Sequence, residues 1–289
     1  MPLLLIAPTV LTLAALMGWP LVNNVLLSLR KVTLRELISR DVVWVGFDNY
    51  RTILADPAFW DAVVRSVLFT AACAATTMVV GVLMALLLVR LPRFPKLVLS
   101  ISLVLAWATP VLAATTVFQW LFDTDFGVVN WLLARVGLDT EGHSWFSTGR
   151  STFLVAGLLV VWQAVPLVVF SISAALATVP PELDEAAVID GATASQRWWT
   201  ITFPLVRPMI GVLAFLQVIW DFKAFTQVYA MRRGGPDSST TTLPILIYQE
   251  GLARSQFGLA AAASVVTVAI LLVLLALYVR SAVRAEEVR

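Results

Sequence analysis

Six long apolar stretches constrain what this chain can fold into. A helix that crosses a lipid bilayer needs about 20 predominantly apolar residues. Six stretches meet that requirement, at about residues 3–29, 66–89, 97–122, 151–179, 205–231 and 258–279. Hydrophobic residues make up 60% of the sequence and charged residues 13%, against roughly a quarter charged in soluble domains. The sequence therefore predicts an all-α, polytopic membrane protein with six transmembrane helices, in one transmembrane domain over residues 1–289.

The first apolar stretch is not expected to be a cleaved signal peptide. It has no basic leading region, and it is longer than the apolar core of a signal peptide. Gly18, Trp19 and Pro20 interrupt it without forming a small-residue cleavage site. We therefore count it as the first span.

The composition also limits the chemistry. The single cysteine, Cys73, lies in an apolar stretch and the single histidine is His143, so we expect neither a disulfide framework nor a metal site. None of the three lysines (Lys31, Lys96, Lys223) follows the glycine that a phosphate-binding P-loop requires. We expect no catalytic centre and no nucleic-acid binding. A membrane-embedded enzyme is the alternative from another class, and it would need a titratable pair or a metal cluster within the spans.

Between the fourth and fifth stretches lies a polar, patterned segment at about residues 180–204. Pro180 and Pro181 stop the preceding stretch, and proline is tolerated at a first helical position because its missing N–H has no helical partner there. Carboxylates suit the positive end of the helix dipole. Three follow the prolines: Glu182, Asp184 and Glu185. Gly191 can adopt the left-handed conformation that ends a helix. The pattern predicts a short helix from the prolines to Gly191.

A second helix is predicted directly after Gly191. Thr193 and Gln196, three residues apart, have the spacing of a capping box, in which each side chain satisfies a backbone N–H of the other residue. Pro204 and Pro208 are expected to bend or close this helix as the chain re-enters an apolar stretch. Together the two helices form a helix-turn-helix on one side of the membrane.

The same segment carries a sequence signature with the spacing E-A-A-x3-G-x9-I-x-L-P. Its positions are Glu185, Ala186, Ala187, Gly191, Ile201 and Pro204. Phe203 stands where leucine is usual. In this signature the chain resembles the membrane (permease) subunits of bacterial binding-protein-dependent ABC importers. The resemblance implies that the loop, which includes Asp190, is cytoplasmic and docks into a cleft on an ATPase subunit. An ordinary amphipathic connector between membrane helices is the alternative interpretation.

Basic residues near the ends of the spans predict the orientation, because cytoplasmic connections carry an excess of Lys and Arg. Two clusters follow spans two and six: Arg90, Arg93 and Lys96, and then Arg280, Arg284 and Arg289. A third cluster lies on the opposite side: Arg30, Lys31, Arg35, Arg40 and Arg51. The resemblance places the signature loop inside, in agreement with the first two clusters. We therefore expect both termini in the cytoplasm of a bacterium, with the chain in its cytoplasmic membrane.

Three outer segments resemble the sugar-importer branch of the family: residues 31–61, 123–150 and 232–257. The resemblance rests on Gly-Phe-Asp-Asn-Tyr at 46–50, Gly-Val-Val-Asn-Trp at 127–131 and Gly-Gly-Pro at 234–236 before a threonine-rich run. It implies that the substrate is a carbohydrate, from a mono- to an oligosaccharide. An importer of glycerol-3-phosphate or glycerophosphodiesters is the runner-up, because that relative has the same loops.

The resemblance also implies partners and a mechanism. A second permease subunit, here a non-identical one, would complete the membrane part beside this chain, in contact with membrane lipid. Two ATPase subunits would bind ATP and magnesium, so this chain would bind no cofactor itself. An extracytoplasmic binding protein would deliver the substrate. Access would alternate by rigid-body motion, with the signature loop transmitting ATPase closure to the spans.

Polar residues inside a span are costly in lipid and tend to face a cavity or a partner. Gln217, Asp221 and Ala224 recur at i, i+4 and i+7 in span five, so they share one helix face. Resemblance to the larger permease subunit of maltose-type importers implies that these positions contact the sugar. The alternative is that Asp221 pairs with a base on the partner subunit.

Further pathway positions follow from the resemblance. Trp107, three residues before Pro110 in span three, stands in the place of a sugar-stacking tyrosine. An indole face suits the apolar face of a sugar ring. Around Pro166 in span four, Gln163 and Leu167 lie near the family's sugar contacts. These residues and those of span five make up the expected substrate pathway.

Overall fold

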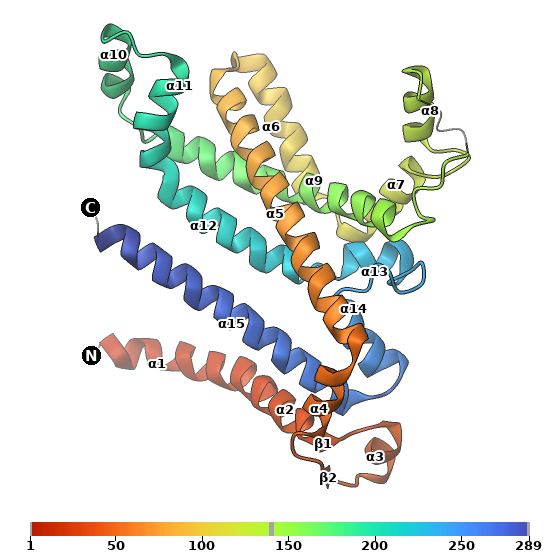
Figure 1. Cartoon of the computed structure of the whole chain (residues 1–289). Helices are drawn as coiled ribbons and strands as arrows, with labels where there is room; N and C mark the ends of the chain where they lie inside the picture. The colour runs from red at the N-terminus through yellow and green to blue at the C-terminus, as the bar shows by residue number, and fades with distance from the viewer. Residues whose placement is uncertain (1, 139–141, 288–289) are drawn as a thin grey trace. The chain divides into compact units, whose positions relative to one another are not determined.

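A computed structural model describes residues 2–138 and 142–287, and most of this chain is helical (Figure 1). Within the described residues the only sheet pairs two short strands, β1 (Arg30–Lys31) and β2 (Val43–Trp44), so the all-α class is confirmed. The contacts divide the chain into unit 1, Met1–Arg65 with Thr241–Arg289, and unit 2, Ser66–Thr240. The single transmembrane domain stays a prediction. Asp139 and Arg289, expected outside and inside the cell, lie outside the described residues.

Unit 1 begins with a long apolar helix. α1 (Pro2–Leu13) and α2 (Trp19–Ser28) are joined by a π-helical turn, η1 (Ala14–Gly18), and the residues flanking that turn keep helical backbone angles. Large apolar side chains such as Leu16 and Trp19 are exposed on this helix. Such a surface is compatible with lipid as the solvent, because lipid tails are as apolar as leucine.

The last helix of the chain, α15 (Phe257–Glu287), packs against α2 in unit 1. Four consecutive alanines near its start are buried: Ala260, Ala261, Ala262 and Ala263. Small side chains let helix backbones approach closely in membranes. At Gly258 a Cβ atom would lie 2.3 Å from the backbone oxygen of Arg30, so this approach requires glycine. α15 is preceded by α14 (Leu243–Tyr248) and the π-helical turn η3 (Gln249–Ala253).

Between β1 and β2 lies a short helix, α3 (Leu34–Ser39), and α4 (Asp48–Ala55) follows β2. The side chain of Asn49 donates hydrogen bonds to the backbone oxygens of Ser28 (2.8 Å) and Arg30 (2.9 Å), which ties α4 to the end of α2. α5 (Pro57–Arg90) then begins in unit 1 and continues into unit 2. The expected second span, 66–89, lies within it.

Unit 2 contains the remaining helices. They are α6 (Arg93–Ala108), α7 (Val111–Leu121), α8 (Val128–Arg135), α9 (Gly149–Leu176), α10 (Pro181–Ile189), α11 (Ala194–Arg197), η2 (Trp198–Thr202, π-helical), α12 (Phe203–Phe222) and α13 (Thr226–Arg232). α9 packs against α6, α7, α12 and α13. Val168 and Val169 of α9 are buried in a core that α5, α6 and α12 also supply. At Gly81 of α5 a Cβ atom would lie 2.5 Å from Val168, so α5 passes close to α9 there.

The ends of α9 organise unit 2. Its C-terminal end leads to α10, and the α5–α6 connection lies toward the same end of the unit (Figure 1). α7, α8 and α13 lie toward the other end. His143 lies in the loop between α8 and α9, where its ring contacts that of Trp145 edge to face, with centroids 4.8 Å apart. His143 is thus a loop residue, as expected.

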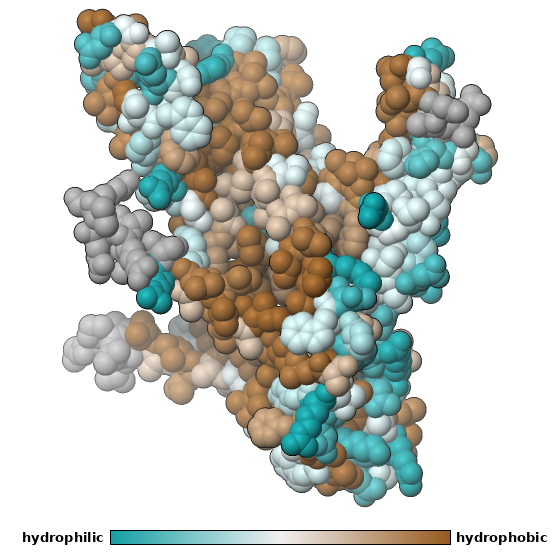
Figure 2. Space-filling view, in the orientation of Figure 1, coloured by the Kyte–Doolittle hydropathy of each residue, from teal (hydrophilic) through white to brown (hydrophobic). Residues whose placement is uncertain are grey.

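The described residues contain five helices long and apolar enough to cross a membrane, or six spans if the bent pair α6–α7 counts as one. The expected span 97–122 is therefore not one straight helix, because α6 and α7 meet at 106° around Thr109 and Pro110. The expected span 205–231 is likewise divided, into α12 and α13. Hydropathy registers how apolar a stretch is and not where its helix breaks. Figure 2 shows apolar side chains over the long helices and hydrophilic ones around α10 and α3.

Candidate coupling and translocation sites

The candidate coupling segment, residues 180–204, begins as the sequence predicts. Pro180 is the N-cap of α10 and Pro181 is its first residue. Glu182 and Asp184 lie in the first turn, where their charge opposes the positive end of the helix dipole. The prolines therefore end the preceding stretch and start the new helix.

Gly191 makes the turn between the two helices. Its φ of +80° is left-handed, and its N–H donates to the backbone oxygen of Val188 (3.0 Å). The N–H of Ala192 donates to the oxygen of Ala187 (2.9 Å), which completes a Schellman motif and satisfies the last carbonyls of α10. A Cβ atom at Gly191 would meet nothing within 4 Å, so the backbone angle rather than space requires glycine here.

Thr193 caps the second helix as expected. Its backbone N–H donates to Oε1 of Gln196 (2.8 Å), and the N–H of Gln196 donates to Oγ1 of Thr193 (3.3 Å). Pro204 and Pro208 were expected to bend or close this helix. Closure is wrong, because α11 continues through η2 into α12 and both prolines lie in α12, whereas the bend stays a prediction. The π-helical turn shifts the hydrogen-bond pattern just before Pro204, which has no N–H to donate.

An ion pair joins the two helices of the coupling segment. Nη1 of Arg197 lies 2.5 Å from Oδ2 of Asp184, across the turn that Gly191 makes. The Asp184 side chain is half exposed, so the pair contributes less than about 1 kcal/mol. It links α10 to α11 across the turn.

The signature positions lie along this hairpin. Glu185 and Ala186 of α10 are exposed, Ala187 is half-buried, and Asp190 is the exposed C-cap. Ile201 lies in η2, half-buried. The sequence analysis did not single out three exposed apolar side chains of α10: Leu183, Val188 and Ile189, the last 85% exposed. Apolar residues in an otherwise polar segment were the available signal, since exposed apolar patches mark contact surfaces.

The break in the third span lies beside Gln163, one of the predicted pathway residues. α6 ends at Ala108, Thr109 has an extended backbone, and the first hydrogen bond of α7 reaches only the oxygen of Pro110, so the carbonyl of Thr109 has no partner in a helix. Nε2 of Gln163, on α9, donates to that oxygen at 3.2 Å. Trp107, two residues before Thr109, is 62% exposed. Leu167 follows Gln163 one turn later on α9 and is half-buried.

The residues of span five form a buried group. Gln217 and Asp221 share a helix face, since Nε2 of Gln217 donates to Oδ1 of Asp221 at 2.7 Å. Both side chains are buried, as is Ala224. The expectation that Ala224 shares their helix face is wrong, because α12 ends at Phe222, before Ala224. Oδ2 of Asp221 is buried without a hydrogen-bond partner in the described chain. Cys73 of α5 is a neighbour of Asp221.

The two broken spans also contact each other. Nε2 of Gln119, on α7, donates to the backbone oxygens of Ala230 (3.2 Å) and Met231 (3.1 Å) on α13. α7 follows the break after α6, and α13 follows the break after α12. These two hydrogen bonds join α7 to α13. Non-helical backbone at membrane depth occurs where it is buried in protein or lines a cavity, so these breaks mark a candidate translocation site.

The chain has long apolar helices, one of them sharply broken, and a charged helix-turn-helix before the fifth span. This arrangement is that of the membrane subunit of a transport system. The sequence profile of the family described as "Binding-protein-dependent transport system inner membrane component" matches residues 77–285, and this chain belongs to that family. It is therefore a multi-pass protein of the inner membrane.

The relatives and solved structures agree with this assignment. The chain is 47% identical over 287 residues to the diacetylchitobiose uptake system permease protein DasB of Streptomyces coelicolor, covering 99% of this chain and 88% of that protein. It is 33% identical to the sulfoquinovosyl glycerol transport system permease protein SmoG of Agrobacterium fabrum, covering 96% and 88%. A chain of a bacterial ABC transporter that imports the acidic polysaccharide alginate has the same fold, with a TM-score of 0.83, 19% identity and coverage of 96% and 93%.

Proposed function

We propose that this chain is the permease subunit of an ABC importer that carries a short oligosaccharide across the cytoplasmic membrane. The observation that carries the proposal is the 47% identity, over nearly the whole chain, to a diacetylchitobiose permease. Diacetylchitobiose is therefore the first substrate to test. The second relative, SmoG, is named as a permease for sulfoquinovosyl glycerol, so an anionic glycoside is the competing substrate to compare with diacetylchitobiose.

The hairpin formed by α10 and α11 is the proposed contact with an ATPase subunit. Its exposed apolar side chains, Val188 and Ile189, would become the buried centre of the interface on docking. Glu185 and Asp190 would form its polar rim. Because α11 runs without a break into α12, a displacement of the hairpin is transmitted directly to span five.

The proposed substrate pathway lies at the breaks in spans three and five. Trp107 offers an exposed indole face for a sugar ring, and Asp221 offers an acceptor with no donor in the chain itself. Gln163 and Gln217 are engaged with Thr109 and Asp221, so they are proposed to hold these groups in position.

The proposed assembly places a second, non-identical permease beside this chain and two ATPase subunits below them. The family description names a binding-protein-dependent transport system, and an extracytoplasmic binding protein is proposed to deliver the substrate. With the coupling hairpin in the cytoplasm, an even number of spans puts both termini there as well. The segment that carries β1, α3 and β2 then lies on the outer face.

Uptake by whole cells tests the proposal. A strain that lacks this chain, but keeps its neighbouring transport genes, is supplied with radiolabelled diacetylchitobiose, and full-length chain is returned on a plasmid. We expect uptake only with the plasmid, and we expect unlabelled diacetylchitobiose to compete better than an anionic glycoside. Equal uptake without the chain, or competition by the anionic glycoside alone, would overturn the proposed substrate class.

A further inference from the structure

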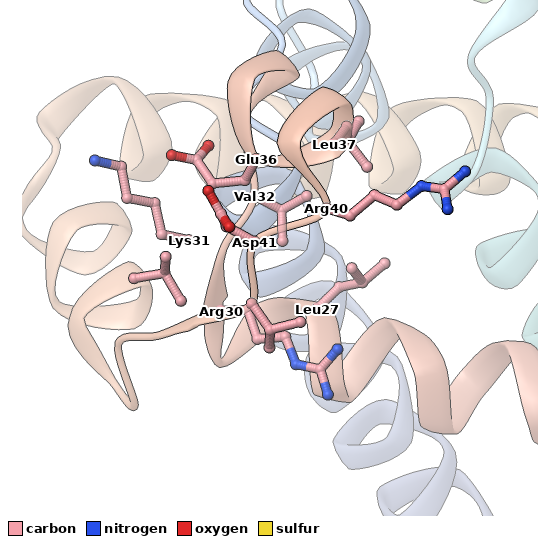
Figure 3. A pocket seen from close by; sticks show the side chains of 10 residues that line it. Leu27, Arg30, Lys31, Val32, Glu36, Leu37, Arg40 and Asp41 are labelled. Atoms are coloured by element: carbon pink, nitrogen blue, oxygen red, sulfur yellow. The ribbon is translucent and has the colours of Figure 1, made fainter.

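A pocket of about 250 Å³ lies in unit 1, where the first apolar helix ends (Figure 3). Three cationic side chains line it, Arg30, Lys31 and Arg40, together with the carboxylates of Glu36 and Asp41. In Figure 3 the guanidinium group of Arg40 extends to the right and that of Arg30 to the bottom of the view, whereas Lys31 and the Glu36 carboxylate lie at the upper left. Both arginines therefore extend away from Lys31 and Glu36.

The Glu36 carboxylate is already engaged at the other side. It accepts hydrogen bonds from the hydroxyl of Thr33 and from the backbone N–H of Thr33 (2.9 Å), in the capping box that starts α3. The Thr33 hydroxyl, followed by its backbone N–H, holds the pKa of Glu36 below its usual range, and the charge of Lys31 adds to the effect. Glu36 and Lys31 thus offset each other, and among the other lining residues the two arginines, Arg30 and Arg40, outnumber the one carboxylate, Asp41.

Arg30 and Arg40 have unused hydrogen-bond donors. The Arg30 guanidinium lies over the ring of Trp44, 4.1 Å from its centroid, and its Nε is buried without a hydrogen-bond partner in the described chain. Arg40 ends α3 in the left-handed conformation, with φ of 57°. Among the described residues neither arginine has a carboxylate partner. Their planar N–H groups match the paired oxygens of a phosphate.

The surroundings of the pocket are apolar and exposed. Six large side chains between residues 34 and 47 are half exposed or more: Leu34, Leu37, Ile38, Val42, Trp44 and Phe47. This segment follows α2 directly, so it continues a surface that faces lipid. Exposed apolar and aromatic side chains mixed with cations, at the end of a membrane helix, are typical of an element that lies among lipid headgroups.

We propose that this pocket binds the phosphate of an anionic phospholipid headgroup in the outer leaflet, with Arg30 and Arg40 on the phosphate and Leu27 and Leu37 against the first acyl carbons. The inference rests on the orientation in the proposed function. It also explains why a basic cluster occurs on the outer side, against the positive-inside rule, since anionic lipid neutralises it. An acidic protein partner would match the charge but would leave the apolar side chains beside the span without their lipid.

Lipid titration of the purified, assembled transporter tests this proposal. The complex is stripped of lipid in detergent and titrated with phosphatidylglycerol or phosphatidylcholine, and bound lipids are counted by native mass spectrometry. For Arg30→Gln with Arg40→Gln we expect phosphatidylglycerol to bind roughly 30-fold more weakly, given the usual contribution of each cation near a membrane surface. Arg40→Gln alone should give part of that loss, and it leaves the contact of Arg30 with Trp44 intact.

The matched control is Arg35→Gln with Arg51→Gln, which removes the same charge from the same segment outside the pocket lining. We expect it to leave phosphatidylglycerol binding unchanged. An equal loss of phosphatidylglycerol binding in the control would show that the pocket is not a specific lipid site. Equal binding of phosphatidylcholine by the wild-type complex would show the same. Displacement of the lipid by inorganic phosphate at lipid-like concentrations would make it a site for free phosphate, against the proposal. Weaker binding-protein affinity with unchanged lipid binding would make it a protein interface instead.

A separate measurement distinguishes failure of the orientation from failure of the pocket. Ser39→Cys, in a Cys73→Ala background, should react with an impermeant thiol reagent added outside intact cells. Reaction only from the cytoplasmic side would overturn the orientation and the outer leaflet together, even where the two arginines still bind phosphatidylglycerol.

Discussion

Nε2 of Gln163 donates a hydrogen bond to the backbone oxygen of Thr109, 3.2 Å away, and so joins α9 to the break in the third span. The carbonyl has no helical partner, because Thr109 has an extended backbone beyond the end of α6 and the first hydrogen bond of α7 runs from the N–H of Ala114 to the oxygen of Pro110. An unpaired carbonyl is costly away from water. Gln163 therefore stabilises the bent backbone that presents Trp107.

Gln163→Leu should destabilise this bend. The substitution keeps similar bulk but leaves the Thr109 carbonyl unpaired, which costs about 1–3 kcal/mol. We expect a lower melting temperature of the purified complex and slower uptake. Gln163→Glu is the matched variant, since it keeps the shape and, as a carboxylate, loses the donor. Wild-type stability in both variants would show that the bond does not hold the bend.

Gly191→Val should weaken coupling to the ATPase. Valine would have to adopt φ near +80°, at a cost of about 1–2 kcal/mol, although its Cβ would clash with nothing within 4 Å. We expect less ATPase subunit on purification and weaker stimulation of ATPase activity by the binding protein. Gly211→Val is the control, because Gly211 also has open space but no positive φ. Wild-type stimulation in Gly191→Val would contradict the coupling role.

The coupling hairpin could be predicted from the sequence because its determinants are local. Pro181, Gly191 and the pair Thr193 and Gln196 each act within a few residues, and the structure confirms all of them. The continuation of the second helix through Pro204 could not be predicted in the same way. A π-helical turn, in which the N–H of Phe203 donates to the oxygen of Trp198, directly precedes Pro204, and the chain stays helical through it.

The candidate translocation site was less predictable because its contacts are distant in sequence. The i, i+4 spacing correctly placed Gln217 and Asp221 on one helix face. Their burial depends on which helices cover that face, and no local pattern encodes this. The partner of Gln163 is also remote, since the glutamine lies on α9 and Thr109 follows α6.

The ion pair between Asp184 and Arg197 should make a small contribution to coupling. Arg197→Ala frees the angle between α10 and α11, so we expect a modest fall in binding-protein-stimulated ATPase activity. The charge-reversed double variant, Asp184→Arg with Arg197→Asp, should recover part of the loss, whereas each reversal alone places like charges together. A double variant no better than the worse single one would argue that the pair has no role.

Single-cysteine labelling should establish the topology. In a Cys73→Ala background, Ser238→Cys should react with an impermeant thiol reagent added outside intact cells. Arg93→Cys and Arg284→Cys should react only after the cells are opened, because these cations follow the positive-inside rule. Labelling of Arg93→Cys from outside would reverse the proposed orientation and remove the coupling hairpin from the cytoplasm.

Asp221 has one satisfied oxygen and one unsatisfied oxygen. Oδ1 accepts from Gln217 at 2.7 Å, and Oδ2 is buried without a partner in the described chain. A carboxylate in the middle of a membrane costs about 2.5–3.5 kcal/mol on insertion scales. We therefore expect the missing donor to come from a substrate hydroxyl or water when the pathway opens, with Trp107 stacking on the sugar ring.

Asp221→Ala should then reduce uptake while leaving the amount of co-purified partner permease unchanged. Asp221→Asn keeps an oxygen for Gln217 and should lose less, and Cys73→Ala, which removes a neighbour but no carboxylate, should have little effect. Trp107→Ala should shift the preference among sugars, since it removes the stacking surface. A purely structural Asp221 gives the opposite result, because loss of a buried ion-pair partner costs assembly rather than transport. If Asp221→Ala abolishes co-purification of the partner, or if Asp221→Ala and Trp107→Ala both leave uptake and sugar preference untouched, these residues do not form the substrate pathway.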